Sequence, residues 1–231
     1  MVRDPDRTAE AVLWERGLSR VVGIDEAGMG ALAGAVVAAA VLTRPGEPAI
    51  PGVRDSKMLS AARRVLLAER IHREAAAVGI GAASPAEIGR LGIRHATHLA
   101  MRRAIGRIPA PDHVLVDGLP APELGAILGP FTAIVRGDAS SYPIACASIV
   151  AKVTRDALMD RLSLRYPGYG WDRNAGYGTA DHLAALARLG PTVVHRAGFA
   201  PVRAAAAGSP EQLGLDLESP AASAPPSSTG R

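Results

Sequence analysis

The sequence predicts an α/β domain whose C-terminal portion is helical and is followed by a tail of different composition. Short apolar runs alternate with longer segments of helical periodicity, which is typical of an α/β fold. Hydrophobic residues make up 48% of the 231 residues and aromatic residues only 3%, so the predicted core is aliphatic. From Ala204 onward the chain is rich in Ala, Ser, Pro and Gly, which predicts a disordered tail over residues 204–231.

Five short apolar segments are predicted as strands. They cover residues 21–25, 35–42, 79–83, 113–117 and 131–135. The run at residues 35–42 suits a buried strand, although its alanines leave a helix possible on periodicity alone. The first and fourth segments end on Asp25 and Asp117, so each places an acid at the border between core and solvent.

Helices are predicted between these strands and after them. Ser60 can cap a helix that runs to residue 78, and Ser84 forms a capping box with Glu87. Further helices are predicted over residues 94–107, 143–164 and 179–189. The last of these belongs to the helical C-terminal portion that precedes the tail.

The overall charge and the single cysteine limit the class of protein. The formal net charge is +4 and the sequence pI is about 9.7, a mild basic excess that is compatible with a phosphate-bearing partner. No apolar run reaches the ~18 residues of a membrane span, and the charged N-terminus lacks the apolar segment of a secretory signal. Cys146 cannot form an intrachain disulfide, so we expect a cytoplasmic protein with no membrane partner.

Four acids lie at the ends of buried elements or just beyond them, namely Asp25, Glu26, Asp117 and Asp138. Adjacent carboxylates at the edge of a core repel one another unless cations neutralise them. Carboxylate oxygens without a thiolate or histidine cluster favour Mg²⁺ or Mn²⁺. Two such ions ~3.5–4 Å apart can clamp the attacking and leaving oxygens of a phosphodiester. Each acid taken singly is better explained by a turn or a helix start, but the four acids together with their flanking residues indicate a metal site.

Six blocks of sequence, taken in order, resemble the type 2 ribonucleases H, the ribonuclease HII family. The blocks are GIDEAGMG from Gly23, DSKMLS from Asp55, VDG from Val116, GD from Gly137 with ASIVAKVTRD from Ala147, GYGT from Gly176 and HRAGF from His195. Together they span about residues 21–202. One block alone is moderate support for the resemblance, whereas six in family order are strong support.

The resemblance implies a ribonuclease H-like mixed five-stranded sheet that is flanked by helices and has a helical C-terminal portion. Residues 20–203 would form the catalytic domain, after a lead-in of residues 1–19. The implied activity is endonucleolytic cleavage of the RNA strand of RNA–DNA hybrids and incision at ribonucleotides embedded in duplex DNA, leaving a 3′-hydroxyl and a 5′-phosphate. It would use two Mn²⁺ or Mg²⁺ ions. Asp25, Glu26 and Asp117 match the family's metal ligands, and Asp138 matches its fourth catalytic carboxylate.

The loop from Gly28 through Met29 to Gly30 is the predicted substrate reader. Glycines let the main chain approach a ribose closely, and the 2′-hydroxyl distinguishes RNA from DNA. The resemblance adds Tyr177, which would pack on the sugar after the ribonucleotide; the alternative is a half-buried core tyrosine. The family usually has arginine at the position of Met29 and proline at that of Ala31. We therefore expect retained chemistry with a weaker or altered preference for the ribonucleotide–deoxyribonucleotide junction.

Lys57 and Lys152 are the only lysines that we find, and both fall inside the blocks. They resemble phosphate contacts. The alternatives are ordinary solvation and, for Lys152, a structural pairing with an acid. Asp156 lies inside the predicted long helix, so we expect it to be structural and to pair with Arg155 or Lys152.

The tail contains a hexapeptide, from Gln212 to Leu217, that resembles the motif by which bacterial replication and repair proteins bind the sliding clamp. A disordered peptide of this kind would order on binding and use its leucines as anchors. Chance occurrence in a biased tail explains the hexapeptide equally well. For the oligomeric state we expect a monomer.

Three other functions were weighed. A type 3 ribonuclease H would share the acids but carries a substantial N-terminal substrate-binding domain, and about twenty residues precede the first predicted strand. A non-catalytic module that binds RNA–DNA hybrids would lack at least one of the four acids. A polynucleotidyl transferase such as a resolvase or transposase is disfavoured by the blocks at Asp55 and Gly176.

Overall fold

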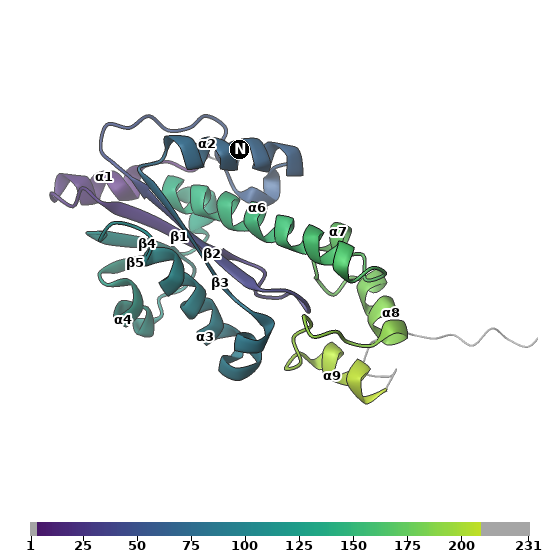
Figure 1. The fold of residues 1–231 in the computed structure, drawn as a ribbon. Coiled ribbons are helices and arrows are strands. Elements are labelled where there is room, and N and C mark those ends of the chain that lie inside the picture. The colour runs from purple at the N-terminus through teal and green to yellow at the C-terminus, as the bar shows by residue number, and fades with distance from the viewer. Residues whose placement is uncertain (1–3, 209–231) are drawn as a thin grey trace, which may run out of the picture.

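The computed structural model describes residues 4–208, and at its centre lies a mixed five-stranded sheet (Figure 1). Its strands are β1 (Val21–Ala27), β2 (Val36–Thr43), β3 (Ala77–Ala83), β4 (His113–Asp117) and β5 (Phe131–Ile134), in the order β3-β2-β1-β4-β5. β1 pairs antiparallel with β2 and parallel with β4; β2–β3 is antiparallel and β4–β5 parallel. The predicted mixed sheet flanked by helices is confirmed.

The alanine-rich segment at residues 35–42 forms strand β2, so the strand interpretation is confirmed over the helical one. β2 is buried along its whole length and lies between β1 and β3. Val36 and Ala38 face one hydrophobic cluster, whereas Ala39 and Val41 face another. Because a strand in this position is covered on both faces, its sequence shows no polar alternation.

Helices cover both faces of the sheet (Figure 1). On one face lie α2 (Ala61–Glu74) and α6 (Tyr142–Arg165), whose apolar side chains pack against Ala39 and Val41. On the other face lie α3 (Pro85–Ile105) and the short α4 (Gly125–Leu128), packed against Val22 and Ile24. These two clusters are mainly aliphatic, as the composition predicted, with Tyr142 as the aromatic member, whereas a third cluster in the C-terminal portion is built around Tyr169 and Trp171.

Several helix boundaries differ from those predicted. The helix capped by Ser60 ends at Glu74, not at residue 78, because the backbone is already extended at Ala75 and β3 starts at Ala77, where it pairs with Leu42 of β2. The capping box at Ser84 is present and starts α3, which runs through to Ile105 across a non-helical residue, Gly92. Tertiary pairing overrides the helical preference of alanine in the first case.

The lead-in of residues 1–19 contains helix α1 (Thr8–Glu15), which the sequence did not predict. Its Leu13 packs against Val21, Leu115 and Ile144 at one end of the sheet. Three short elements lie between the main ones: η1 (Ser56–Met58), η2 (Pro122–Leu124) and α5 (Gly137–Ser140). Among residues 4–208, no helix is long and apolar enough to span a membrane.

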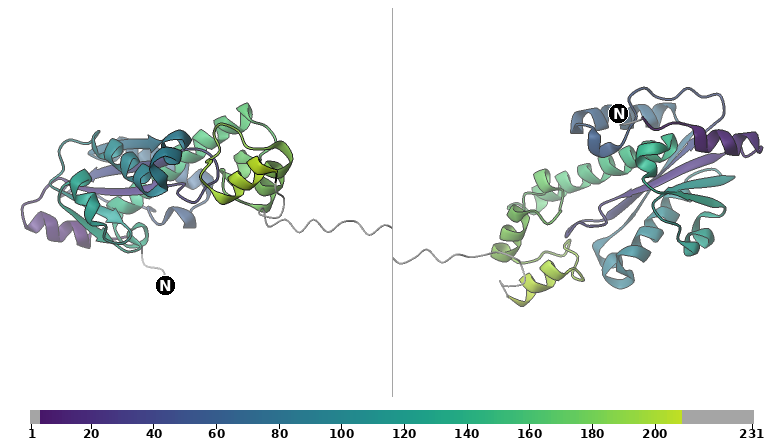
Figure 2. Two further views of the ribbon diagram at one scale, coloured as in Figure 1. Left: turned by 90° about the horizontal axis from the view of Figure 1, so that it is seen from below. Right: turned by 180° about the vertical axis from the view of Figure 1, so that it is seen from behind.

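The C-terminal portion is helical, as predicted, and the long helix α6 connects it to the sheet (Figure 2). It contains α7 (Trp171–Asn174), α8 (Ala180–Leu189) and α9 (Ala200–Ala207). The predicted start of the tail at Ala204 is wrong, because α9 continues to Ala207 and buries Ala204. The clamp-like hexapeptide from Gln212 to Leu217 lies outside the described residues.

Candidate active site

The four predicted acids come from two adjacent strands of the sheet and from the short helix that follows a third strand. Asp25 and Glu26 lie in β1, which continues two residues beyond the predicted end and pairs there with β2. Asp117 ends β4, the parallel neighbour of β1, and the residues just before Asp25 and Asp117 are register partners. Asp138 lies in α5, which follows β5. The pairing of parallel strands therefore brings together acids that are far apart in the sequence.

The electrostatics of these acids show that they interact. Burial raises the pKa of Asp25 well above its usual range, and Glu26 and Asp117 raise it further by repulsion. Burial, with repulsion from Asp117, raises the pKa of Glu26 to about 7. The pKa of Asp117 is raised by burial and then by Asp138. Asp25, Glu26 and Asp117 therefore ionise less readily than three isolated carboxylates would, and a cation placed among them would stabilise their ionised forms.

Asp138 has a basic partner. Lys57 Nζ donates a hydrogen bond to Asp138 Oδ2 at 2.8 Å, and this contact raises the pKa of the lysine. The Asp138 side chain is buried, whereas the lysine side chain is 77% exposed. Asp117 Oδ1 accepts a hydrogen bond from the amide of Gly137 at 2.7 Å, which joins the end of β4 to the start of α5. In this structure Lys57 is thus paired with an acid.

A cavity of about 420 Å³ collects almost all of the predicted site residues. Its lining comprises Asp25, Glu26, Ala27, Gly28, Met29, Gly30, Ser56, Lys57, Asp117, Ser148, Lys152 and Tyr177. Every predicted site residue is in this set except Asp138, which is hydrogen-bonded to Lys57 of the lining. The structure therefore brings the predicted site together around one cavity.

Two serines in this cavity were not predicted. The Ser148 hydroxyl lies 3.0 Å from that of Ser56, and a hydrogen bond from Ser148 to Asp25 opposes the rise in the pKa of the acid. Both serines sit inside the recognised blocks, directly beside Lys57 in one case and four residues before Lys152 in the other. Position within those blocks was the signal available, but a serine there has many structural uses.

Lys152 lies at the edge of the cavity and pairs with Asp156 at 2.6 Å, one helical turn further along α6. The predicted pairing of Asp156 with Lys152 is confirmed, and Arg64 approaches the same acid at 3.7 Å. Tyr177 is 36% exposed and borders the cavity, with the Lys152 ammonium 5.9 Å from its ring centroid. The tyrosine is thus partly exposed and lines the same cavity as three of the acids.

A larger cavity of about 560 Å³ lies elsewhere, between α1 and β5. Its apolar lining includes Val12, Leu13 and Ile134, and it contains none of the predicted site residues. Size alone does not locate the site here, because the chemistry is carried by the carboxylates of the smaller cavity.

The donor set fits a hard divalent cation. Carboxylates and hydroxyls supply only oxygen, which Mg²⁺ and Mn²⁺ prefer. Within residues 4–208, no three acidic, histidine or cysteine side chains are already grouped closely enough to hold an ion by themselves.

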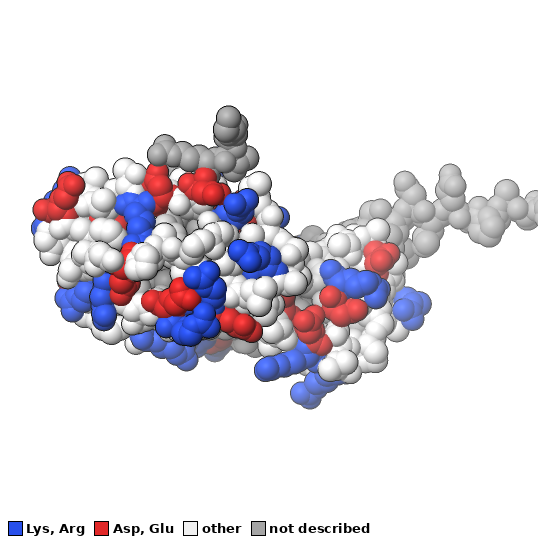
Figure 3. All heavy atoms as spheres, turned by 90° about the horizontal axis from the view of Figure 1, so that it is seen from above, with Lys and Arg blue, Asp and Glu red and all other residues white. Residues whose placement is uncertain are grey.

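The charge on the surrounding surface is mixed. Figure 3 shows the face covered by α2 and α6, on which Lys and Arg side chains are interspersed with Asp and Glu. The mild basic excess of the sequence is therefore spread over this face and does not form one continuous positive surface on it.

The mixed five-stranded sheet and the cavity lined by acids of adjacent strands define a ribonuclease H-like enzyme. The family model for ribonuclease HII matches residues 22–202 of the chain. The chain therefore belongs to the ribonuclease HII family and is a ribonuclease H, as the resemblance predicted.

Curated relatives agree with this assignment over most of their length. The ribonuclease HII of Synechococcus sp. (strain JA-3-3Ab) is 53% identical over 209 residues, which are 90% of this chain and 93% of that protein. The ribonuclease HII of Rhodospirillum rubrum is 55% identical over 195 residues, which are 82% and 88% of the two chains. This similarity favours type 2 over the type 3 alternative.

Solved structures share the fold. The ribonuclease H2 of Pyrococcus horikoshii OT3 has a TM-score of 0.69 at 22% identity, covering 81% of this chain and 97% of that one. The ribonuclease HII of Archaeoglobus fulgidus, solved in complex with PCNA, has a TM-score of 0.67 at 27% identity, and the match covers 78% of this chain and 95% of that one. The Bst ribonuclease HIII in complex with Mn²⁺ has a TM-score of 0.65 at 18% identity, and the match covers 84% of this chain and 71% of that one. The predicted ribonuclease H-like fold is confirmed.

Proposed function

We propose that the protein is an endonuclease that cuts the RNA strand of RNA–DNA hybrids and incises duplex DNA at embedded ribonucleotides. The products would be a 3′-hydroxyl and a 5′-phosphate. The observation that carries this proposal is the single cavity in which Asp25, Glu26 and Asp117 meet the glycine loop and Tyr177. Acids suited to metal binding and a main chain suited to reading a ribose thus lie side by side.

Asp25, Glu26 and Asp117 would hold two divalent cations, Mg²⁺ or Mn²⁺. Two bound ions supply Lewis-acid activation of the attacking water and stabilise the departing 3′-oxygen. The chain's own contribution is to orient the ligands: Ser148 hydrogen-bonds Asp25, and Gly137 donates to Asp117. Asp138, which Lys57 holds beside Glu26 and Asp117, would serve as the fourth catalytic carboxylate. The Mn²⁺ complex of the Bst ribonuclease HIII supports the choice of metal.

The loop at Gly28 would read the ribonucleotide. Gly28 has φ of +94°, a left-handed conformation that favours glycine, and it leads into Met29, which is 37% exposed at the cavity. Main-chain amides of this loop would contact the 2′-hydroxyl, and Tyr177 would pack on the next sugar. Lys57 and Lys152 would contact phosphates when substrate arrives, exchanging part of their present pairing with acids.

Partners beyond the nucleic acid are also proposed. The Archaeoglobus fulgidus relative was solved in complex with PCNA, which supports an interaction between this chain and a sliding clamp through Gln212 to Leu217. We place the enzyme in the cytoplasm as a monomer, where its nucleic acids lie and where its single cysteine stays reduced.

The test is cleavage of two labelled substrates, a continuous RNA–DNA hybrid and a DNA duplex with one ribonucleotide, in Mg²⁺ and in Mn²⁺. Wild type should cut both, and at the single ribonucleotide it should leave a nick with a 3′-hydroxyl and a 5′-phosphate that a ligase can reseal without any synthesis. Asp117→Asn should lose at least about 10³-fold in kcat, because a metal ligand is removed. The exposed Asp172→Asn is the matched control and should be unaffected. Equal activity of Asp117→Asn and wild type would overturn the metal assignment.

A further inference from the structure

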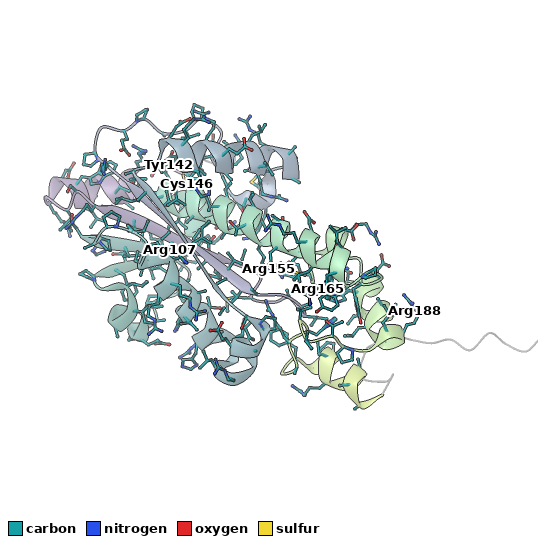
Figure 4. All side chains as sticks on the ribbon, in the orientation of Figure 1. Arg107, Tyr142, Cys146, Arg155, Arg165 and Arg188 are labelled. Carbon is teal, nitrogen blue, oxygen red and sulfur yellow. The ribbon has the colours of Figure 1, made fainter. Side chains whose placement is uncertain are left out.

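Two arginines are buried beneath the predicted substrate loop, and each is 0% exposed. Arg155 projects from α6, the helix that also carries Ser148 and Lys152, toward the loops beyond β1 (Figure 4). Arg196 follows the loop after α8. Among the described residues, neither guanidinium forms a hydrogen bond to a carboxylate; both bind main-chain carbonyl oxygens instead.

Arg196 holds the substrate loop from behind. Its Nη1 donates to the carbonyl of Met29 at 2.8 Å, and its Nε donates to the carbonyl of Gly34 at 2.9 Å. The two contacts are made by one rigid planar group, so they fix the distance between the start and the end of the loop. Because the buried Arg196 binds the carbonyl of Met29, the main chain at Met29 has a fixed orientation at the cavity.

Arg155 connects the same loop to the segment that carries Tyr177. Its Nε and Nη2 donate to the carbonyls of Ala35 and Ala33 at 3.1 and 3.2 Å, and its Nη1 donates to Ala175 at 2.9 Å. Its guanidinium carbon lies 5.2 Å from the ring centroid of Tyr177. One side chain therefore spans both structures that would read the substrate.

Close packing makes this connection stiff. A Cβ atom added at Gly28 would lie 1.9 Å from Arg155 Nε, so the arginine occupies the space that any other residue at Gly28 would need. Gly176, on the Tyr177 side, leaves no room either, because its Cβ would lie 2.8 Å from the carbonyl oxygen of Ala33. Both glycines are thus required by contact as well as by their positive φ.

The cost of this arrangement argues against a merely space-filling role. Burial lowers the pKa of both arginines, that of Arg196 to about 9, and the charge of Arg155 contributes to the latter. Two desolvated cations close together are less favourable than two apolar side chains of similar volume. What the arginines provide, and apolar side chains cannot, is five directed hydrogen bonds to the carbonyls of two loops.

We propose that Arg155 and Arg196 are positioning residues that set the spacing between the Gly28–Gly30 loop and Tyr177, and thereby the selectivity for an isolated ribonucleotide in DNA. The inference rests on the proposed function. A continuous hybrid offers a ribose at every position, so a displaced loop still meets one. A duplex with one ribonucleotide has a ribose at only one position. The loop at Gly28 and Tyr177 must therefore be the correct distance apart to contact that ribose and the sugar after it.

The test compares kcat/KM on the two substrates for wild type, Arg155→Lys and Arg196→Lys. Lysine keeps the charge but cannot bind two carbonyls with one planar group. We expect kcat/KM on the single-ribonucleotide duplex to fall about 10- to 100-fold, mainly through kcat, and that on the hybrid to fall less than about threefold. Exposed Arg165→Lys and Arg188→Lys are matched controls on α6 and α8 (Figure 4).

The outcomes are distinguishable. An unchanged ratio between the two substrates overturns the inference and leaves the proposed function intact. An equal loss on both substrates, or failure of both lysine variants to fold by thermal melting, means that the arginines are structural only and also overturns it. If wild type itself does not cut the single-ribonucleotide duplex, the proposed incision activity fails, and this inference fails with it.

Discussion

The Lys57 ammonium hydrogen-bonds the Asp138 carboxylate at 2.8 Å and so connects two segments that are 81 positions apart in the chain. The contact neutralises the buried acid that follows β5, next to Glu26 and Asp117. Lys57 therefore has a role before any nucleic acid binds, in addition to the phosphate contact that we propose for it.

Replacing this lysine should impair turnover more than folding. In Lys57→Gln, Asp138 loses its partner while remaining buried, so its position relative to Asp117 is no longer fixed. We expect kcat to fall about tenfold, while the Mg²⁺ concentration for half-maximal activity does not rise, since a positive charge has left the site. Steady-state kinetics across a Mg²⁺ series measures both. Lys57→Arg, which keeps the pair, is the control, and wild-type kcat in Lys57→Gln would contradict the role.

Neutralising Glu26 should stabilise the protein and abolish its activity. At pH 8 the wild-type chain ionises Glu26, whose pKa is about 7 because of burial and repulsion from Asp117. Glu26→Gln removes that penalty, so without metal it should be more stable by about 1–3 kcal/mol in urea unfolding. Mn²⁺ should raise the Tm of wild type but not of the variant. Glu69→Gln, exposed on α2, is the control; a destabilised Glu26→Gln would refute the prediction.

Glu10 should make stability depend on pH. It is fully buried in α1, and burial raises its pKa from 4.5 to about 7. Between these values the unfolded chain releases the proton while the folded chain retains it, so stability falls as pH rises from about 4.5 to about 7. Glu10→Gln should therefore be more stable than wild type by about 3 kcal/mol at pH 8 and equal to it at pH 4. Urea unfolding at both pH values, with exposed Glu15→Gln as control, measures the difference; a gain that is the same at both pH values would exclude this cause.

Met29→Arg should strengthen binding to the single-ribonucleotide duplex. Met29 is 37% exposed at the cavity, so an arginine side chain can extend from it without disturbing the carbonyl that Arg196 holds. One added phosphate contact should lower KM several-fold and steepen the salt dependence by about one in the log–log slope. Leu164→Arg, which adds the same charge at an exposed position of α6, is the control. Equal KM and salt slope in Met29→Arg and wild type would contradict the prediction.

The hexapeptide from Gln212 to Leu217 should be necessary for binding a sliding clamp. A double variant, Leu215→Ala with Leu217→Ala, removes the apolar anchors and should weaken clamp binding at least about tenfold. Surface plasmon resonance with the purified clamp measures the affinity, and cleavage of a short hybrid without clamp should stay unchanged. Substitution of Ser227 and Ser228 by alanine in the same tail is the control. Unchanged affinity in the double variant would falsify the motif.

The sequence predicted the acids and the strands that carry them because those features are local. Asp117 ends a strand at the predicted residue, and the six blocks identified the family. Features that depend on distant partners were not predictable. The predicted end of α2 was wrong because residues 77 and 78, which were assigned to the helix, pair with β2 as the start of β3. Helix α1 was missed because Leu13 is its main apolar contact with the sheet, which leaves little amphipathic pattern to detect.

In the candidate site too, local features were predicted and features that depend on distant partners were not. Most residues that line the cavity were named from the sequence, and the pairing of Lys152 with Asp156 was predicted as well. The pairing of Lys57 with Asp138 and the support that Ser148 gives to Asp25 were not predicted. Arg155 was considered only as a partner for Asp156, whereas its guanidinium binds carbonyls of loops that lie up to 122 positions away. Hydrogen bonds to main-chain atoms leave no compositional trace, so only coordinates show them.

The contact between Arg196 and the carbonyl of Met29 joins positions 167 residues apart. During synthesis on the ribosome, the five strands are complete once Ile134 has emerged, but the loop at Met29 gains this support only after Arg196 has followed. A nascent chain therefore contains Asp25, Glu26 and Asp117 well before the residue that holds Met29 has been made. Competence for single ribonucleotides is therefore expected to appear only after Arg196 has been synthesised, and a product truncated before Arg196 would lack it.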